Sequence, residues 1–370
     1  MRMRRTASPW RKGKEDGFRA GLADGEHLGR CRAIVRDTVP SLGGSPGTIR
    51  PVSVLYVKTG LWAYAPLDEG VIDALRGLVR DVHIAAPTDD VAAIASTVGA
   101  DLVLALNSVE CLPVRHVDAL RELGIKTAAW FTDDPYYSDV TGDLAPHYDY
   151  VFTLEESCVP FYRDRGCAEA HFLPFGVNTA MYEPKRVTAS YRYDIVFIGS
   201  AFWNRVAYFD RLAPYLRGKR VFIAGYWWDR LKHYSLLADR IRLGYWVSSE
   251  ETASFYNGAK IVINMHRAID DESNRNSRRL PAQSVNPRSF EIGACGTLQL
   301  TDGRVGLPQA YEAGREIAVY GSPEELIERV EHYLNHEEER RETAYRSLHR
   351  TMEEHTYLSR VSRLLGHVFG

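Results

Sequence analysis

Short apolar runs rich in β-branched residues recur along the chain and alternate with helix-length amphipathic segments. The first series lies at 52–57, 82–86, 102–106, 126–132 and 149–153. A second series follows a break and lies at 193–199, 220–225, 241–246, 260–265, 297–301 and 316–321. Such runs, separated by helix-length segments, are typical of parallel strands buried on both faces. The alternation predicts two doubly wound α/β domains, each binding ligands at the carboxyl ends of its strands.

The length of 370 residues agrees with two domains, at roughly 150 residues per domain. We expect a basic leader, a glycine-striped helix and a linker at 1–50, a first domain at 51–180 and a second at 190–350. The pattern at 351–370 is helical, and one interpretation is that this tail crosses back to the first domain. The aperiodic break between the two series predicts the interdomain linker.

Glycine falls at every fourth position from Gly13 to Gly29. In an isolated helix each of these glycines costs about 1 kcal/mol relative to alanine, so a helix here needs a compensating partner. A four-residue step drifts by roughly 40° per repeat and traces a smooth curved stripe. Two interpretations stay open: a docking or dimerisation helix, the latter giving a homodimer, and a glycine-rich leader that frays before the fold.

Composition excludes several classes of protein. Hydrophobic residues make up 45% and charged residues 25% of the chain, which argues against disorder. No apolar run of membrane-spanning length and no secretory signal is present, and the five cysteines form no CxxC pair, so we expect a reducing cytoplasm. Without the six basic residues of positions 1–14, the net charge is −8, which argues against a nucleic-acid partner.

A first candidate site follows the strand at 193–199. Gly199 and Ser200 end the strand, and a helix is expected to begin near Asn204 and Arg205. Free N–H groups at a helix start, together with a guanidinium, can bind a phosphate. The alternative is an ordinary tight turn that favours glycine, with Arg205 in solvent.

A second candidate site follows the strand at 260–265. His266 ends this strand, and Asn286, Arg288 and Glu291 precede a turn of small residues at 293–296. In a helix that starts near position 287, Arg288 and Glu291 share one face and could engage a phosphate and sugar hydroxyls respectively. The alternative for His266 is a hydrogen-bonded histidine of the core. The alternative for Glu291 is a first-turn glutamate that the helix dipole favours.

A third candidate is the pair Asp133 and Asp134 in WFTDDPYY, at the end of a first-domain strand. Two carboxylates there can act as a general base and its helper, because transfer to a hydroxyl requires removal of its proton. Strand geometry sends neighbouring side chains to opposite sides, so at most one is expected to face a donor. The alternative is a turn signature, in which the Asp side chains bond their own backbone.

These motifs carry a family resemblance. The segments NPRSFEIGACGTLQLTD, FIGSAFWNR and INMHR resemble the second domain of CgeB-like glycosyltransferases, bacterial proteins linked to spore-surface maturation, and WFTDDPYY and the glycine leader resemble the first. The resemblance covers nearly the whole chain. It implies the GT-B architecture, with two facing Rossmann-like domains, a nucleotide sugar bound mainly by the second, and usually no metal.

The resemblance also implies roles for single residues. Glu291 matches the glutamate that holds the nucleotide ribose in related enzymes, and Gly296 belongs to the turn beside the same nucleotide. Gln283 stands where many retaining relatives carry a glutamate, so a retaining or inverting outcome stays open. The diphosphate and donor sugar are expected to lie beside Arg205, His266 and Arg288. The candidate catalytic residues are His266, Asp133 and Asp134.

The expected activity is transfer of a sugar from a nucleotide diphosphate sugar, with a UDP-sugar as the expected donor and no cofactor. Absence of an Asp-x-Asp motif favours neutralisation of the diphosphate by arginines rather than by a metal. The acceptor is expected to be a glycan, a glycoprotein or a small molecule, in a spore-surface or cell-envelope setting. Two alternatives stay open: a sugar-nucleotide epimerase, and a non-catalytic carbohydrate-binding or spore-layer structural protein.

Overall fold

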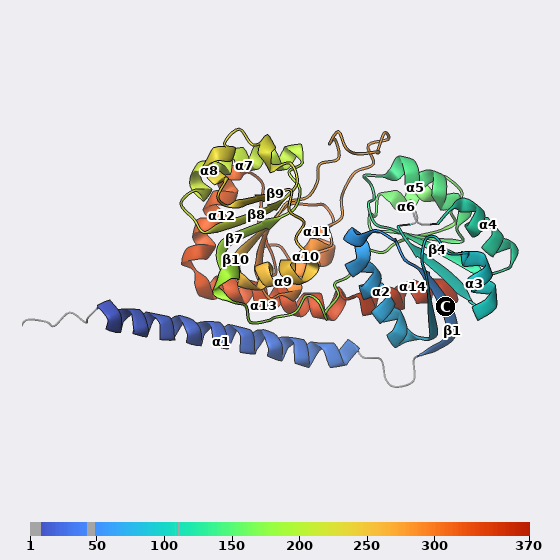
Figure 1. Ribbon diagram of the computed structural model, residues 1–370, viewed down its shortest axis with the longest axis horizontal. Helices are drawn as coiled ribbons and strands as arrows, with labels where there is room; N and C mark the ends of the chain where they lie inside the picture. The colour runs from blue at the N-terminus through green and yellow to red at the C-terminus, as the bar shows by residue number, and fades with distance from the viewer. Residues whose placement is uncertain (1–8, 43–48, 108, 110–111) are drawn as a thin grey trace, which may run out of the picture.

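The computed structural model describes residues 9–42, 49–107, 109 and 112–370, and it has two α/β domains side by side above a long helix (Figure 1). The N-terminal sheet has six parallel strands in the order β2-β1-β3-β4-β5-β6. Its strands are β1 (Arg50–Val57), β2 (Val79–Ala85), β3 (Leu102–Leu106), β4 (Lys126–Phe131), β5 (Tyr150–Thr153) and β6 (Glu169–Phe172).

Helices cover both faces of this sheet, because nearly every strand residue is apolar and needs a packing partner on its own side. One face is covered by α3 (Val91–Val98), α4 (Val114–Glu122) and α6 (Cys158–Arg163). The other face is covered by α2 (Ala65–Leu78) and by the last helix of the chain, α14 (Tyr357–Phe369). The short elements η1 (Trp62–Tyr64), α5 (Ser138–Leu144) and η2 (Ala145–His147) lie in the connections.

The C-terminal sheet also has six parallel strands, in the order β12-β11-β10-β7-β8-β9. Its strands are β7 (Tyr193–Ile198), β8 (Val221–Gly225), β9 (Ile241–Leu243), β10 (Ala259–Asn264), β11 (Leu298–Asp302) and β12 (Ala318–Tyr320). The two parallel sheets confirm the predicted fold class.

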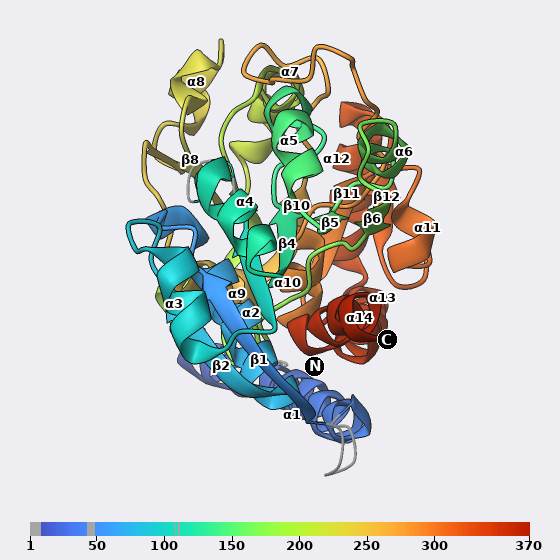
Figure 2. The ribbon, with the colours of Figure 1, turned by 90° about the vertical axis from the view of Figure 1, so that its right-hand side faces the viewer.

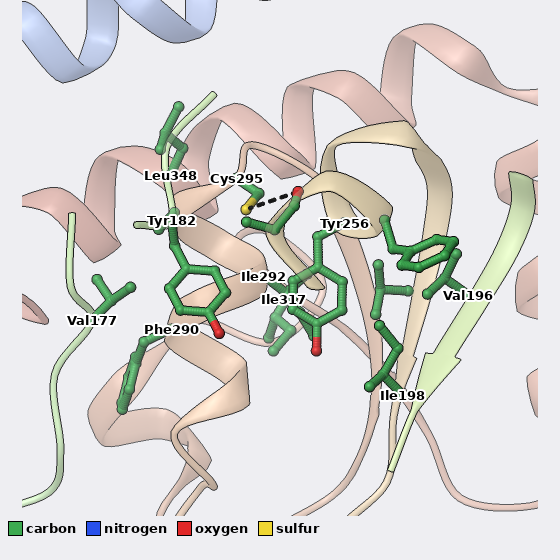
Figure 3. Packing of buried hydrophobic residues seen from close by; sticks show 14 of the residues in the cluster. Val177, Tyr182, Val196, Ile198, Tyr256, Phe290, Ile292, Cys295, Ile317 and Leu348 are labelled. Carbon is green, nitrogen blue, oxygen red and sulfur yellow. Dashed lines mark hydrogen bonds between the residues drawn. The ribbon is translucent and has the colours of Figure 1, made fainter. Parts of the chain in front are cut away.

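Helices again form a layer on each side of the C-terminal sheet. One side holds α7 (Trp203–Leu216), α8 (Tyr234–Leu237) and α12 (Pro323–Asn335). The other side holds α9 (Ser249–Gly258), α10 (Arg288–Ala294) and α13 (Glu337–Glu354), and Figure 3 shows part of this core around Tyr256 and Cys295. The connections contain η3 (Ala189–Tyr191), η4 (Trp228–Arg230) and α11 (Leu307–Ala310).

The glycine-rich segment forms one helix, α1 (Pro9–Leu42), which lies against α13 (Figure 1). The contact uses side chains other than the glycines: Cys31 is buried, His27 Nδ1 lies 2.9 Å from the Tyr345 hydroxyl, and Asp24 pairs with Arg341. No atom lies within 4 Å of the Cβ position at any of the five glycines. The stripe therefore does not make the contact with α13, and its use in a homodimer stays a prediction.

The chain crosses between the domains twice, and the two crossings lie side by side. Val177 N–H donates to the His355 carbonyl at 2.8 Å, and Tyr357 N–H donates to the Val177 carbonyl at 3.2 Å. A Cβ on Gly176 would lie 2.5 Å from the carbonyl carbon of Thr356, so only glycine permits this approach. Beyond the crossing, α14 continues the line of α13 under the N-terminal domain, and the two helices overlap in the view of Figure 2.

Candidate functional site

The C-terminal sheet reverses its strand order between β7 and β10. Counted within the domain, its strands follow the order 3-2-1-4-5-6, and doubly wound sheets bind ligands beside the carboxyl ends of the two strands at such a reversal. Here β7 leads to Gly199 and Ser200, and β10 leads to Met265 and His266. The first two predicted motifs therefore meet at one place.

Arg205, in the first turn of α7, joins these two strand ends. Its Nη1 donates to the Ser200 carbonyl at 2.8 Å, and its Nε and Nη2 donate to the Met265 carbonyl at 3.1 and 2.6 Å. Burial, reinforced by the neighbouring Arg288, lowers the pKa of Arg205 to about 9. The guanidinium stays charged at neutral pH, and these bonds leave two of its five N–H groups for a ligand.

Arg288 approaches the same point from the start of α10. A Cβ on Gly199 would lie 3.1 Å from Arg205 Nη1 and 3.7 Å from Arg288 Nη1, so glycine leaves room for both guanidiniums. Burial opposes the charge of Arg288, but Tyr256 and Glu291 outweigh it and raise its pKa. Among the residues that the structure describes, no carboxylate forms an ion pair with Arg205 or Arg288. Glu291 and Asp302 act on these cations from nearby without an ion-pair contact, so the neighbouring guanidiniums still favour an anionic ligand.

Two further arginines complete the cluster. Arg304 donates from Nη1 to the Ala282 carbonyl at 2.6 Å and from Nη2 to the Arg267 carbonyl at 2.8 Å. The Nε–H groups of both Arg267 and Arg304 are buried, and no hydrogen-bond partner for them is found in the described part of the chain. A buried donor left without a partner costs about 1–3 kcal/mol, so these groups suit a ligand with several acceptor oxygens. We call Arg205, Arg267, Arg288 and Arg304 the arginine cluster.

Glu291 lies one turn after Arg288 on α10. Burial raises the pKa of its carboxyl group, and Arg288 partly offsets this. Within the described residues, no hydrogen bond reaches its carboxylate oxygens, although Tyr182, Tyr256 and Tyr357 are close enough to be affected by its charge. Such a carboxylate can accept hydrogen bonds from ligand hydroxyls.

The structure gives His266 a different role from the predicted catalytic one. Its Nε2 lies 3.1 Å from the Asn286 backbone nitrogen and accepts that N–H, and its Nδ1 lies 2.7 Å from Asp302 Oδ1. The ring is 2% exposed, and burial lowers its pKa although Asp302 opposes this. Because both ring nitrogens have protein partners, we correct the prediction: His266 holds the Asn286 loop and is not placed to exchange protons with a substrate.

The predicted asparagines differ in their surroundings. Asn204 donates from Nδ2 to the His266 carbonyl at 2.9 Å, while its buried Oδ1 finds no donor in the described residues. Asn286 forms a reciprocal amide pair with Asn264, with distances of 2.9 and 3.1 Å. Asn204 thus has an acceptor available to a ligand, whereas the side chain of Asn286 is already paired.

Gly296 lies outside the site. It follows the C-terminal end of α10, and a Cβ there would lie 2.7 Å from the sulfur of Cys31 on α1. It thus precedes β11, at the end of the sheet opposite the arginine cluster. The prediction that Gly296 contacts the nucleotide is corrected: its left-handed φ of +69° and its contact with α1 explain the glycine instead.

The two aspartates after β4 point to different surroundings, as strand geometry predicted. Asp133 Oδ2 accepts hydrogen bonds from the Tyr64 hydroxyl at 2.6 Å and the Thr132 hydroxyl at 2.8 Å. Asp134 is 1% exposed and accepts hydrogen bonds from three buried hydroxyls, those of Thr141, Thr153 and Tyr162. Asp134 therefore belongs to the core, and Asp133 is the aspartate that a substrate can reach.

The segment 266–287 of the C-terminal domain docks on the N-terminal domain and is the arch between the two domains in Figure 1. Glu155, 1% exposed at the end of β5, accepts the backbone N–H groups of Gln283 at 2.9 Å and Ser284 at 3.0 Å. The Tyr136 hydroxyl donates to the Arg267 carbonyl at 3.0 Å. These contacts bring the loop after β4 next to the arginine cluster.

A cavity of about 440 Å³ lies elsewhere, between α1 and the amino ends of β7 and β10. Two of its arginines are engaged within the protein: Arg341 pairs with Glu337 at 2.5 Å, and Arg192 pairs with Asp24. Doubly wound sheets bind ligands at the opposite, carboxyl ends of their strands. We therefore assign the arginine cluster and Asp133 as the candidate site.

Comparison with known proteins identifies the family of the chain. A model of a glycosyl transferase-like family matches residues 205–366. Spore protein CgeB of Bacillus subtilis (strain 168) is 30% identical over 238 residues, which cover 64% of this chain and 74% of that protein. The chain belongs to the CgeB-like glycosyltransferase family.

Solved structures share the fold of this CgeB-like enzyme at low sequence identity. Anabaena Alr3699/HepE in complex with UDP-glucose has a TM-score of 0.61 at 11% identity, covering 86% of this chain and 99% of that one. Sucrose-phosphate synthase from Thermosynechococcus elongatus has a TM-score of 0.57 at 11% identity, with the same coverage. The two-domain GT-B fold implied by the resemblance is confirmed.

Sequence reasoning about this CgeB-like enzyme missed Arg304, Tyr64 and Glu155. Arg304 follows the carboxyl end of β11, a position where ligand contacts are common, and this signal could have found it. Tyr64 and Glu155 act through contacts made between distant segments, and their local sequence gives no such signal. In the described part of the chain, no three His, Cys, Asp or Glu side chains are grouped as metal ligands, and no helix has the length and apolar character of a membrane span.

Asp134 supplies a stability prediction. Burial raises its pKa from 3.8 to about 6. Hydrogen bonds from three hydroxyl groups oppose this rise, and the negative charge of Asp133 adds to it. The folded state therefore binds this proton more tightly than the unfolded state, and stability is lost as pH rises from about 4 through about 6. Relative to the Asp134→Asn variant, the natural enzyme should lose about 3 kcal/mol of unfolding free energy over this range.

Urea unfolding of both proteins at a series of pH values measures this difference. The exposed pair of Asp118 with His147 offers the matched control, Asp118→Asn. Parallel stability curves for the natural enzyme and Asp134→Asn would show that Asp134 does not titrate in this way.

Proposed function

We propose that the donor is a nucleotide diphosphate sugar, with UDP as the nucleotide, bound on the C-terminal domain. The observation that carries this proposal is the arginine cluster, with its two buried Nε–H groups that have no hydrogen-bond partner in the described residues. The carboxylate oxygen Asp302 Oδ2 lies 4.0 Å from Arg304 Nε, beyond hydrogen-bond distance. A diphosphate offers several acceptor oxygens and negative charge at the point where these guanidiniums meet. The structures of Alr3699/HepE in complex with UDP and with UDP-glucose lend support through the shared fold.

We propose separate roles for the other residues of the site. The arginine cluster would neutralise the charge that develops on the departing diphosphate, the task that a metal ion performs in other transferases. Glu291 would accept hydrogen bonds from the ribose hydroxyls. Asn204 Oδ1 would accept a hydrogen bond from a hydroxyl of the nucleotide sugar. Asp133, which belongs to the N-terminal domain, would take the proton from the acceptor hydroxyl as the sugar is transferred.

The finer setting of this activity is also a proposal. We propose that the enzyme works in the cytoplasm and modifies a component of the spore surface. The name of its relative, spore protein CgeB, supports this setting. Detection of the sugar on isolated spores, and its loss after deletion of the gene, would test it.

The ribose role gives a prediction for binding. Glu291→Ala should weaken UDP binding about tenfold, because a carboxylate that accepts hydroxyl hydrogen bonds contributes about 1.5–3 kcal/mol. Isothermal calorimetry with UDP and with 2′-deoxy-UDP measures this effect. The natural enzyme should prefer UDP, and the variant should bind the two ligands with similar affinity.

The outer carboxylate Glu324 on α12 gives a control, since its pairing partner is the exposed Arg211. Glu324→Ala should bind UDP like the natural enzyme. An unchanged UDP affinity in Glu291→Ala would remove the ribose role. If UDP, GDP, dTDP and CMP all fail to bind the natural enzyme, the non-catalytic alternative is favoured.

A further inference from the structure

Large aromatic side chains stand in solvent at the carboxyl ends of the strands, on both sides of the candidate site. Trp62 in η1 of the N-terminal domain is 65% exposed, and Trp246 after β9 of the C-terminal domain is 45% exposed. Their ring centroids are 4.7 Å apart in an edge-to-face arrangement, so the two domains meet through this pair. The contact leaves much of the Trp62 ring open to a third partner.

More aromatic residues continue from this pair along the C-terminal sheet. Gly244 N–H donates to the Gly225 carbonyl at 3.0 Å, which sets the turns after β8 and β9 side by side. Three rings on these turns are between 38% and 41% exposed: Tyr226, Trp227 and Tyr245. We call these three residues, with Trp62 and Trp246, the aromatic strip.

Backbone conformation at Trp227 is a second, independent sign of function. Its φ is +67°, in the left-handed region that bulky residues rarely adopt. Such strain clusters at binding and active sites. Here the strained residue carries a large ring that packs edge-to-face against Phe202 and still leaves 41% of the residue exposed.

The aromatic strip is continuous with the candidate base. Trp62 and Tyr64 belong to the same short helix, η1, and the Tyr64 hydroxyl donates to Asp133 Oδ2 at 2.6 Å. The helix that carries the Trp62 ring therefore also contacts the residue proposed to take the acceptor proton. This position suits an acceptor rather than the donor diphosphate.

Polar groups lie beside the aromatic rings and indicate which kind of molecule can bind there. The Tyr245 hydroxyl donates to Glu251 at 2.7 Å, and the Arg230 guanidinium lies 4.8 Å from the Trp227 ring centroid. A lipid would need an unbroken apolar surface, which these charged side chains interrupt. Sugar rings have apolar C–H faces that stack on aromatic rings and hydroxyl edges that bond carboxylates and guanidiniums.

We propose that the aromatic strip binds an oligosaccharide acceptor, with one sugar ring stacked on Trp62 and the chain continuing over Trp246 towards β8. This proposal rests on the proposed transferase function. It names the class of acceptor: a glycan of several sugar units, free or attached to a carrier, rather than a peptide hydroxyl or a lipid.

The test uses the full-length enzyme and a panel of malto-, cello-, laminari- and chito-hexaoses, with a six-residue Ser/Thr peptide for comparison. Calorimetry measures binding of each probe, and UDP release from UDP-glucose measures turnover. We expect at least one hexaose to bind and to accelerate UDP release, with no effect of the peptide. Trp62→Ala and Trp246→Ala should each weaken saccharide binding by roughly tenfold, the scale of one aromatic stacking contact, and leave UDP affinity unchanged.

Phe18→Ala provides the matched control, because Phe18 is a 72% exposed ring on α1, away from the site. If no hexaose binds, or if the tryptophan variants bind the hexaose normally, the proposal is overturned. Binding of the peptide alone also overturns it. Failure of the enzyme to bind UDP would overturn the proposed function, yet direct saccharide binding would still test the strip.

Discussion

Replacing Arg288 with alanine should lower kcat/KM for sugar transfer by about 10³-fold. Arg288 and Arg205 meet over Gly199, and neither has a carboxylate partner in the described residues. Removing one preorganised charge from such a site typically costs about 10²–10³-fold, and more where it stabilises a departing phosphate. The fold should survive, because loss of Arg288 relieves repulsion on the buried Arg205. Glu291 loses the stabilising charge of Arg288, but it can bind a proton, since burial already raises its pKa.

Steady-state kinetics with a UDP-sugar and thermal unfolding together check this prediction. Arg211→Ala is the matched control, since Arg211 is an exposed arginine on α7 that pairs with Glu324. The control should keep normal kinetics, and Arg288→Ala should keep a normal Tm. Normal turnover in Arg288→Ala would show that the diphosphate is bound elsewhere.

Asp133→Asn should lower kcat by about 10²–10⁴-fold, the range of a general base. The amide keeps the size of the side chain and can still accept the Tyr64 hydrogen bond, but it cannot take a proton from an acceptor hydroxyl. UDP affinity should stay unchanged, because Asp133 lies on the N-terminal domain and the arginine cluster on the other. Calorimetry with UDP and single-turnover transfer measure the two effects separately.

Asp134→Asn gives the internal comparison for this prediction. Its effect should appear in the pH dependence of stability, while its kcat at pH 7 should stay within a few fold of the natural value. Full turnover by both variants would remove the two aspartates from the chemistry. A loss of UDP affinity in Asp133→Asn would instead point to a role in donor binding.

The fold class could be predicted because buried parallel strands leave a direct trace in sequence. The run at 52–57 is apolar at nearly every position, since β1 packs against helices on both faces. β6 (Glu169–Phe172) was missed, because this edge strand is short and only partly buried. The contact of α1 with α13 was also beyond prediction, because it depends on side chains other than the glycines.

The candidate site could be predicted in part. Residues that act where a strand ends, such as Arg205 and Arg288, have a local signal in the change from an apolar run to polar residues. His266 shows the limit of this signal: its role is decided by Asp302, which lies 36 positions further along the chain. Sequence alone could not reveal that both of its ring nitrogens are already bonded.

The place of α14 has a consequence for biosynthesis. The first domain to leave the ribosome lacks part of one of its two helical layers until Tyr357–Phe369 has been made, because Val361, Leu364 and Leu365 complete the core beside α2 on that face. Part of the apolar face of the N-terminal sheet therefore stays uncovered while the whole second domain is translated. Nascent chains halted before α14 should depend on chaperones, and release of the last helix should end that dependence.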